Sequence, residues 1–166
     1  MSGKLAAQYN TLKYMKSFDF AGKKVLIRVD FNVPQDKGLK VTDNTRITAA
    51  MPTITNVLQA GGTPVLMSHL GRPKGERQDQ MSLSHLVSEV EALSGAKVHF
   101  SSECVGSVAK AAVAQAGEGE IVLLENLRFH NEEEAGDEAF AKELAELGDI
   151  YLNDAFGTAH RAHAST

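Results

Sequence analysis

Four arginines carry the clearest chemical signal in this sequence. They are Arg46, Arg72, Arg128 and Arg161, out of six arginines in the chain, and three of them follow short apolar runs. A guanidinium group presents a planar pair of N–H donors that matches carboxylate and phosphate oxygens. His69, in the stretch SHLGRPKG, stands three residues before Arg72. The pattern indicates a binding site for a small, strongly anionic ligand.

The apolar runs that precede these residues predict buried strands. They cover residues 24–29, 63–68, 96–100, 120–125 and 149–153. Each is short, rich in aliphatic and β-branched residues, and lacks apolar/polar alternation, which is typical of strands buried on both faces. Strands alternate with segments of helical spacing, so the sequence predicts an α/β domain. It would have three layers, with a mostly parallel sheet of about five or six strands flanked by helices on both faces.

The helical segments are recognised by apolar residues that recur every three or four positions. Two such stripes are Leu83, Leu86, Val87, Val90 and Leu93, and Phe140, Leu144 and Leu147. Pro52 interrupts a third helical segment. Proline is tolerated at a first helical position but not in a helix interior. We therefore expect two helices here, over residues 45–50 and 52–59.

In a parallel sheet covered by helices, ligands bind at the carboxyl ends of the strands. Polar and charged residues follow the predicted strands at that edge: Asp30, Asn32, His69, Arg72, Asn126, Arg128, Asp154, His160, Arg161 and His163. Arg46 begins the helical segment after the first strand and lies near the same edge. Four guanidinium groups that face one crevice repel one another, so their convergence predicts an anionic ligand. Arg28 lies within a strand, and we expect a structural role for it, paired with an acid.

Composition excludes several classes of protein. The net charge of −4 argues against binding to nucleic acid or to an anionic membrane. No apolar run approaches the about 20 residues of a membrane span, and no signal-peptide pattern is present, so we expect a cytoplasmic protein. The single cysteine, Cys104, fits a reducing compartment. His160 and His163 have a spacing that could hold a metal, but no third ligand is evident, so we expect no metal site.

The anionic site predicted from these residues is also compatible with two functions that involve no catalysis. The domain could be an anion-binding module that senses a phosphorylated metabolite without any catalysis. It could also be a structural α/β domain whose arginines pair with surface acids. The sequence contains neither GxGxxG nor GxxxxGK[ST], the familiar nucleotide-binding patterns.

Five motifs resemble, in order, the N-terminal half of the phosphoglycerate kinase family: RVDFNVP, DNTRITAAMPTI, MSHLGRPKG, LLENLRFHNEEE and YLNDAFGTAHRAHAS. The resemblance begins near Phe20 and implies a Rossmann-like substrate domain over 20–166, after a variable leader over 1–19. It implies glycolytic phosphoryl transfer between ATP and the carboxylate of 3-phosphoglycerate, which forms 1,3-bisphosphoglycerate.

The resemblance also implies roles for individual residues. Asp30, Phe31 and Asn32 would contact the glycerate end of the substrate, and Arg46 would act as the catalytic cation at the transferring phosphoryl group. Substrate binding would also involve His69, Leu70, Gly71, Arg72, Arg128 and Arg161. Mg-ATP or Mg-ADP would be bound by a C-terminal domain that this sequence lacks. We therefore expect a fragment that is inactive alone, from an enzyme that works as a monomer with that domain in cis.

Overall fold

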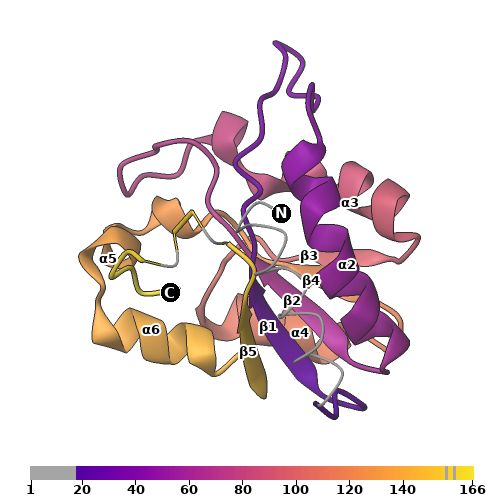
Figure 1. The fold of residues 1–166 in the computed structure, drawn as a ribbon. Coiled ribbons are helices and arrows are strands. Elements are labelled where there is room, and N and C mark those ends of the chain that lie inside the picture. Colours follow the sequence, from indigo (N-terminus) through magenta and orange to yellow (C-terminus); the bar gives the residue numbers. More distant parts are fainter. Residues whose placement is uncertain (1–17, 156, 159) are drawn as a thin grey trace.

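The computed structural model describes residues 18–155, 157–158 and 160–166 (Figure 1). Most of the expected leader, residues 1–17, lies outside the described residues. Within these residues, five strands form one sheet: β1 (Lys24–Arg28), β2 (Thr63–Met67), β3 (Val98–Phe100), β4 (Ile121–Leu123) and β5 (Ile150–Asn153). Their order is β3-β4-β2-β1-β5, and every neighbouring pair is parallel. The predicted parallel α/β sheet is confirmed, with five strands.

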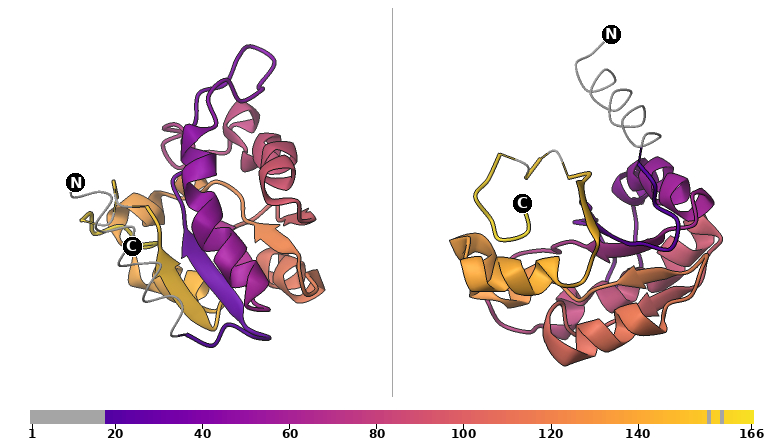
Figure 2. Two further views of the ribbon diagram at one scale, coloured as in Figure 1. Left: turned by 45° about the vertical axis from the view of Figure 1, so that its right-hand side comes forward. Right: turned by 90° about the horizontal axis from the view of Figure 1, so that it is seen from below.

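Helices cover both faces of this sheet (Figures 1 and 2). They are α2 (Thr45–Gln59), α3 (Val87–Ser94), α4 (Gly106–Gln115), α5 (Asn131–Ala135) and α6 (Glu138–Ala145). Three short 3₁₀ turns, η1 (Asp79–Met81), η2 (Leu83–Leu86) and η3 (Leu127–Phe129), complete the connections. None of the helices within the described residues has the length and apolar character needed to cross a bilayer.

Two apolar cores lie between these layers. Val25 and Ile27 of β1 pack in the core beneath α2 and α3, whereas Leu26 packs in the core beneath α4 and α6. Successive side chains of a strand point to opposite faces. Because both faces are covered, all three side chains are buried. Two-sided burial explains why the strand sequences show no alternation of apolar and polar residues.

The prediction of two helices divided at Pro52 is wrong. Helix α2 is continuous, and Pro52 lies inside it. An internal proline removes a backbone hydrogen bond and costs about 3 kcal/mol. The helix buries one face against the sheet through Ile47, Ala50, Thr53, Ile54 and Val57. Burial of a large aliphatic side chain contributes about 1.5–3 kcal/mol, so the three aliphatic side chains together outweigh the cost of the proline.

Candidate functional site

A polar pocket of about 340 Å³ lies at the carboxyl ends of the strands. Its lining residues are Asp30, Asn32, Arg46, His69, Gly71, Arg72, Arg128, Gly157, Thr158 and Arg161. All four arginines of the sequence pattern therefore share one pocket. A second pocket, of about 400 Å³, lies between α6, β5 and the last three residues, and none of its described lining residues is a cation. The polar pocket is the better candidate for binding an anion.

The turn after β1 supplies the first part of the site. Asp30 Oδ1 accepts a hydrogen bond from the Asn32 backbone N–H at 3.2 Å. Arg46, in the first turn of α2, places Nη1 3.2 and 3.3 Å from the two Asp30 carboxylate oxygens and 3.1 Å from the Asn32 carbonyl oxygen. The Arg46 side chain is 53% exposed. An exposed pair of this kind contributes little to stability, so an incoming anion can compete with Asp30 for Arg46.

The loop after β2 supplies His69, Gly71 and Arg72. Gly71 has a φ of +65°, and its N–H donates to Asn32 Oδ1 at 2.9 Å, which ties this loop to the turn after β1. Arg72 is exposed and lines the pocket. His69 is buried, with Nδ1 2.8 Å from Arg28 Nη2. Because arginine has no acceptor, His69 Nδ1 accepts this hydrogen bond, and the proton of the neutral ring resides on Nε2.

The charge state of His69 follows from its surroundings. The pKa of His69 is lowered to about 3, mainly by burial and in the same direction by the charges of Arg28, Arg128, Arg161 and His163. The imidazole is therefore neutral at physiological pH and offers one N–H donor to the pocket.

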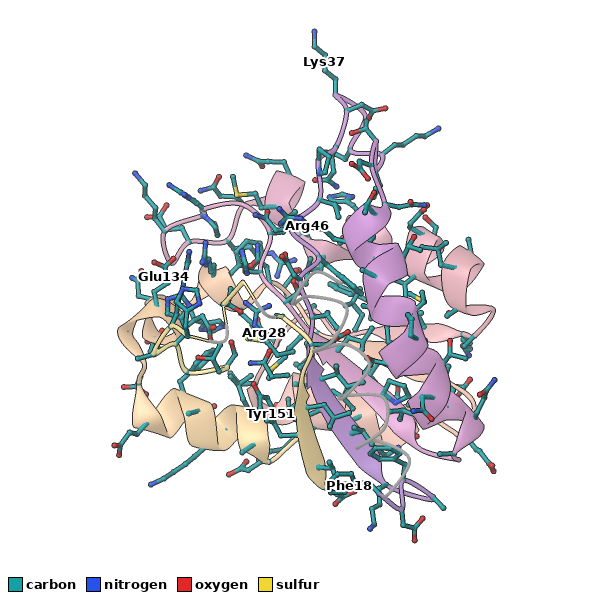
Figure 3. All side chains as sticks on the ribbon, viewed as in Figure 1. Phe18, Arg28, Lys37, Arg46, Glu134 and Tyr151 are labelled. Carbon is teal, nitrogen blue, oxygen red and sulfur yellow. The ribbon has the colours of Figure 1, made fainter. Side chains whose placement is uncertain are left out.

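Arg28 is fully buried at the end of β1, as a structural residue would be. The expected pairing with an acid is not an ion pair, because no carboxylate among the described residues contacts Arg28 directly. Its Nε donates to Ser165 Oγ at 3.0 Å, and Nη1 donates to the Val29 carbonyl. Burial lowers the pKa of Arg28, and the nearby charge of Glu133 opposes that shift. In Figure 3, Arg28 and Arg46 lie at one end of β1, away from Phe18.

Arg128 is presented by η3. Asn126 caps this turn, with Oδ1 accepting from the Arg128 backbone N–H at 3.0 Å. The Arg128 side chain is 9% exposed, and its Nε lies 3.3 Å from a Glu134 carboxylate oxygen without forming a hydrogen bond to any described residue. Its Nη1 makes one long contact, 3.5 Å, to the Gly71 carbonyl oxygen. The pocket thus contains a nearly buried cation with incompletely satisfied donors.

Not every residue of the sequence expectation reaches the pocket with its side chain. Phe31 and Leu70 are buried in the core, and their backbone N–H groups donate to Ser68 Oγ and Asn126 Oδ1. Conversely, the expectation did not include Gly157 and Thr158, which line the pocket. Both lie in the segment DAFGTAHRAH, but small residues carry no chemical signal of their own.

Asn126, Asp154 and His160 also follow strands at this edge, but they are not among the described lining residues of the pocket. Asn126 is fully buried, and its Nδ2 donates to the carbonyl oxygens of Leu70 at 2.7 Å and Met81 at 2.9 Å. Burial raises the pKa of Asp154 to about 6, partly offset by a hydrogen bond from Thr53. His160 is exposed. Across the described residues, no group of three or more His, Cys, Asp or Glu side chains is arranged to hold a metal ion.

Cys104 is buried in the core beneath α4 and α6. Burial raises the pKa of its thiol, because a thiolate would be poorly solvated there. The side chain behaves as a small apolar group in this position.

Comparison with known proteins identifies the family. The family model described as phosphoglycerate kinase matches residues 15–166. Among relatives, a phosphoglycerate kinase of Moorella thermoacetica is 55% identical over 152 residues, which cover 92% of this chain and 38% of that protein. One of Synechococcus elongatus is 53% identical over 156 residues, covering 94% of this chain and 39% of that protein.

Solved structures agree with the sequence comparison. The phosphoglycerate kinase of Coxiella burnetii superimposes with a TM-score of 0.78 at 34% identity, covering 92% of this chain and 37% of that one. That of Pyrococcus horikoshii gives a TM-score of 0.80 at 31% identity, covering 90% and 38%. The chain thus spans about 38% of the length of the first curated relative that it matches. It belongs to the phosphoglycerate kinase family.

Proposed function

We propose that the polar pocket binds 3-phosphoglycerate or 1,3-bisphosphoglycerate, and that residues 20–166 form the substrate domain of a phosphoglycerate kinase. The observation that supports this most is the convergence of four arginines and a neutral histidine on one pocket, in a chain of this family. A substrate with a phosphate at one end and a carboxylate at the other complements such a pocket.

In this proposal one residue, Arg46, is catalytic and the others bind the substrate or support the residues that bind it. Asp30 and Asn32 contact the glycerate end, and Phe31 supports the turn that carries them from within the core. Arg46 is the catalytic cation at the transferring phosphoryl group. Substrate is held further by His69, the Leu70–Gly71 backbone, Arg72, Arg128 and Arg161.

The chemistry requires positioning and charge stabilisation rather than a base. The carboxylate of 3-phosphoglycerate is ionised at neutral pH, so it attacks the γ-phosphorus of ATP without loss of a proton. Catalysis then depends on alignment and on cations that stabilise the charge of the moving phosphoryl group. A pocket rich in arginine, whose one histidine has a pKa of about 3, fits this requirement.

The proposal assigns nucleotide binding to a different domain. A C-terminal domain in cis binds Mg-ATP or Mg-ADP, and closure of the two domains excludes water and aligns the substrates. We further propose a cytoplasmic monomer that binds neither nucleic acid nor membranes. The net charge of −4 and the single, buried cysteine support this part of the proposal.

Calorimetric titration of the chain with 3-phosphoglycerate at low salt tests the binding step. We expect saturable heat that is lost in Arg128→Met and retained in Arg77→Met, because Arg77 is not among the pocket residues. A folded protein that gives neither heat nor a thermal shift would refute the proposal. Adding the C-terminal part of the Moorella thermoacetica relative and following 1,3-bisphosphoglycerate formation tests catalysis. Binding without any activity in that assay would favour a non-catalytic anion-binding module.

A further inference from the structure

A hydrogen-bonded network of four buried side chains ends at the polar pocket, which His69 lines. They are Glu133 of α5, Ser165 near the end of the chain, Arg28 of β1 and His69 after β2, all under one-tenth exposed. Ser165 Oγ donates to Glu133 Oε1, and the Ser165 backbone N–H donates to Glu133 Oε2 at 3.1 Å. Arg28 then bridges Ser165 Oγ, 3.0 Å from Nε, and His69 Nδ1, 2.8 Å from Nη2.

The donor and the acceptor of each hydrogen bond in this network follow from the chemistry of its side chains. Arginine only donates, so both Ser165 Oγ and His69 Nδ1 accept from Arg28. The Ser165 hydroxyl proton is then free to point at the Glu133 carboxylate. The His69 proton is confined to Nε2, on the side of the ring away from Arg28. Residues 137 positions apart in the sequence, Arg28 and Ser165, thereby fix the tautomer of a pocket residue.

The same network balances the positive charge of Arg28 with the negative charge of Glu133. A fully buried guanidinium without a counter-charge is costly. Glu133 provides that counter-charge one side chain away, and it favours the charged form of Arg28. The groups that act on His69 are Arg28 from β1, Arg128 from η3, and Arg161 and His163 from the C-terminal segment, and each of them disfavours an imidazolium.

We infer that Glu133, Ser165 and Arg28 are positioning residues that hold His69 as a neutral Nε2–H donor toward the anion in the pocket. The inference rests on the proposed function for the identity of that anion. A protonated His69 would lose its bond from Arg28, because both ring nitrogens would then donate. Ser165 also anchors the segment that carries Arg161, so one network sets two ligand contacts.

The ring nitrogens of His69 report this arrangement directly. Long-range ¹H–¹⁵N correlation spectra of the ¹⁵N-labelled chain without ligand distinguish the two tautomers and the imidazolium. His69→Gln identifies the His69 signals among those of the six histidines. We expect the Nε2–H tautomer from about pH 8 down to about pH 5, where an ordinary histidine is mostly protonated. An Nδ1–H tautomer, or protonation of His69 within that range, would overturn the inference.

Ser165→Ala tests the positioning role, with Ser165→Thr as the conservative variant and Ser88→Ala, on the exposed surface of α3, as the matched control. Ser165→Ala removes one acceptor from Arg28 and the hydroxyl donor to Glu133 Oε1, and it keeps the backbone N–H donor to Glu133 Oε2. We expect exchange between the two His69 tautomers and a dissociation constant for 3-phosphoglycerate that rises about 2- to 10-fold, the equivalent of one neutral hydrogen bond. We expect Ser165→Thr to restore the single tautomer and Ser88→Ala to change nothing.

The two proposals fail in different ways. A wild-type chain that shows the Nε2–H tautomer but binds no 3-phosphoglycerate refutes the proposed function and leaves the assignment of His69 standing. If the wild-type chain binds 3-phosphoglycerate and Ser165→Ala keeps both the single His69 tautomer and the wild-type affinity, the positioning role is refuted. If the amide spectrum shows that Ser165→Ala is unfolded, Glu133→Gln replaces it as the test variant. The glutamine keeps an acceptor for Ser165 and removes only the negative charge. A single Nε2–H tautomer together with an unchanged affinity for 3-phosphoglycerate in Glu133→Gln would also count against the inference.

Discussion

Replacement of Arg128 by methionine should weaken ligand binding strongly and change the stability of the unliganded fold only slightly. In the structure, this side chain is 9% exposed, Nε has no hydrogen-bond partner among the described residues, and the nearest carboxylate belongs to Glu134, itself 57% exposed. The cation is therefore nearly buried but poorly satisfied until an anion enters the pocket. Methionine keeps most of the apolar volume and removes the charge. Arg128→Met should weaken ligand binding without weakening the fold.

The size of each effect follows from the contacts. A hydrogen bond from a charged group contributes about 1.5–3 kcal/mol, so loss of one raises the dissociation constant about 10- to 150-fold. The pair with Glu134, whose carboxylate is exposed to solvent, contributes at most about 1 kcal/mol. Replacement of a poorly paired buried ion by an apolar side chain is often neutral or stabilising. The free energy of unfolding without ligand should therefore fall by no more than about 1 kcal/mol, and an increase is compatible with the same reasoning.

Urea unfolding with and without 3-phosphoglycerate measures both quantities. At a ligand concentration about 100 times the wild-type dissociation constant, wild type should gain about 2.7 kcal/mol of stability, and Arg128→Met only about 0.3–1.4 kcal/mol. Arg77→Met is the matched control, because Arg77 pairs with the buried Glu125 at 3.4 Å and is not a pocket residue. We expect that control to lose stability and to keep the ligand effect. An Arg128→Met chain that loses several kcal/mol without ligand, or gains the full ligand effect, would refute the reasoning.

Three further predictions concern other parts of the site. In the reconstituted kinase assay, Arg46→Lys should lower kcat on the order of 100-fold, because a point charge does not replace a planar fork at the transferring group; a rise in KM alone would show that Arg46 only binds. Asp154→Asn should raise the free energy of unfolding by up to about 3 kcal/mol near pH 7.5 and by nothing near pH 4. The sign follows because the native state, with the raised pKa of about 6, binds more protons than the unfolded state between the ordinary value of 3.8 and about 6. The cost of the ionised carboxyl therefore develops over this range and is complete above about pH 6. Asp79→Asn, at an exposed position, should show no such difference, and equal effects of Asp154→Asn at both pH values would contradict the raised pKa of the half-buried Asp154. Affinity for 3-phosphoglycerate should fall steadily as salt rises from about 50 mM to about 500 mM, and salt-independent binding would contradict an ionic pocket.

Much of the site was predictable because its residue types are chemically distinctive. Arginine, histidine and aspartate at the ends of buried strands can be read from the chain, and parallel topology brings strand ends to one edge. Eight of the ten expected binding residues line the pocket. Phe31 and Leu70 do not, because a motif assigns roles to neighbouring positions together, whereas alternate side chains of an extended segment point to opposite sides.

The errors share one physical cause, which is that packing at a distance outweighs local preference. Pro52 locally disfavours a helix interior, yet α2 continues through it because the buried face on either side packs against the sheet. Arg28, within a strand, was expected to pair with an acid. It instead reaches Glu133 through Ser165, a residue 137 positions away that no local pattern could associate with it.

The sequence by itself determined the strand and helix periodicity, the parallel α/β class and the set of cations available to bind an anion, because these depend on residue type and on spacing along the chain. Only the tertiary structure decided which of those cations are satisfied, which ring nitrogen of His69 accepts a hydrogen bond, and that Arg28 is the donor of that bond. Those properties depend on burial and on hydrogen bonds between residues that are distant in the chain, and neither quantity exists until the layers have packed together.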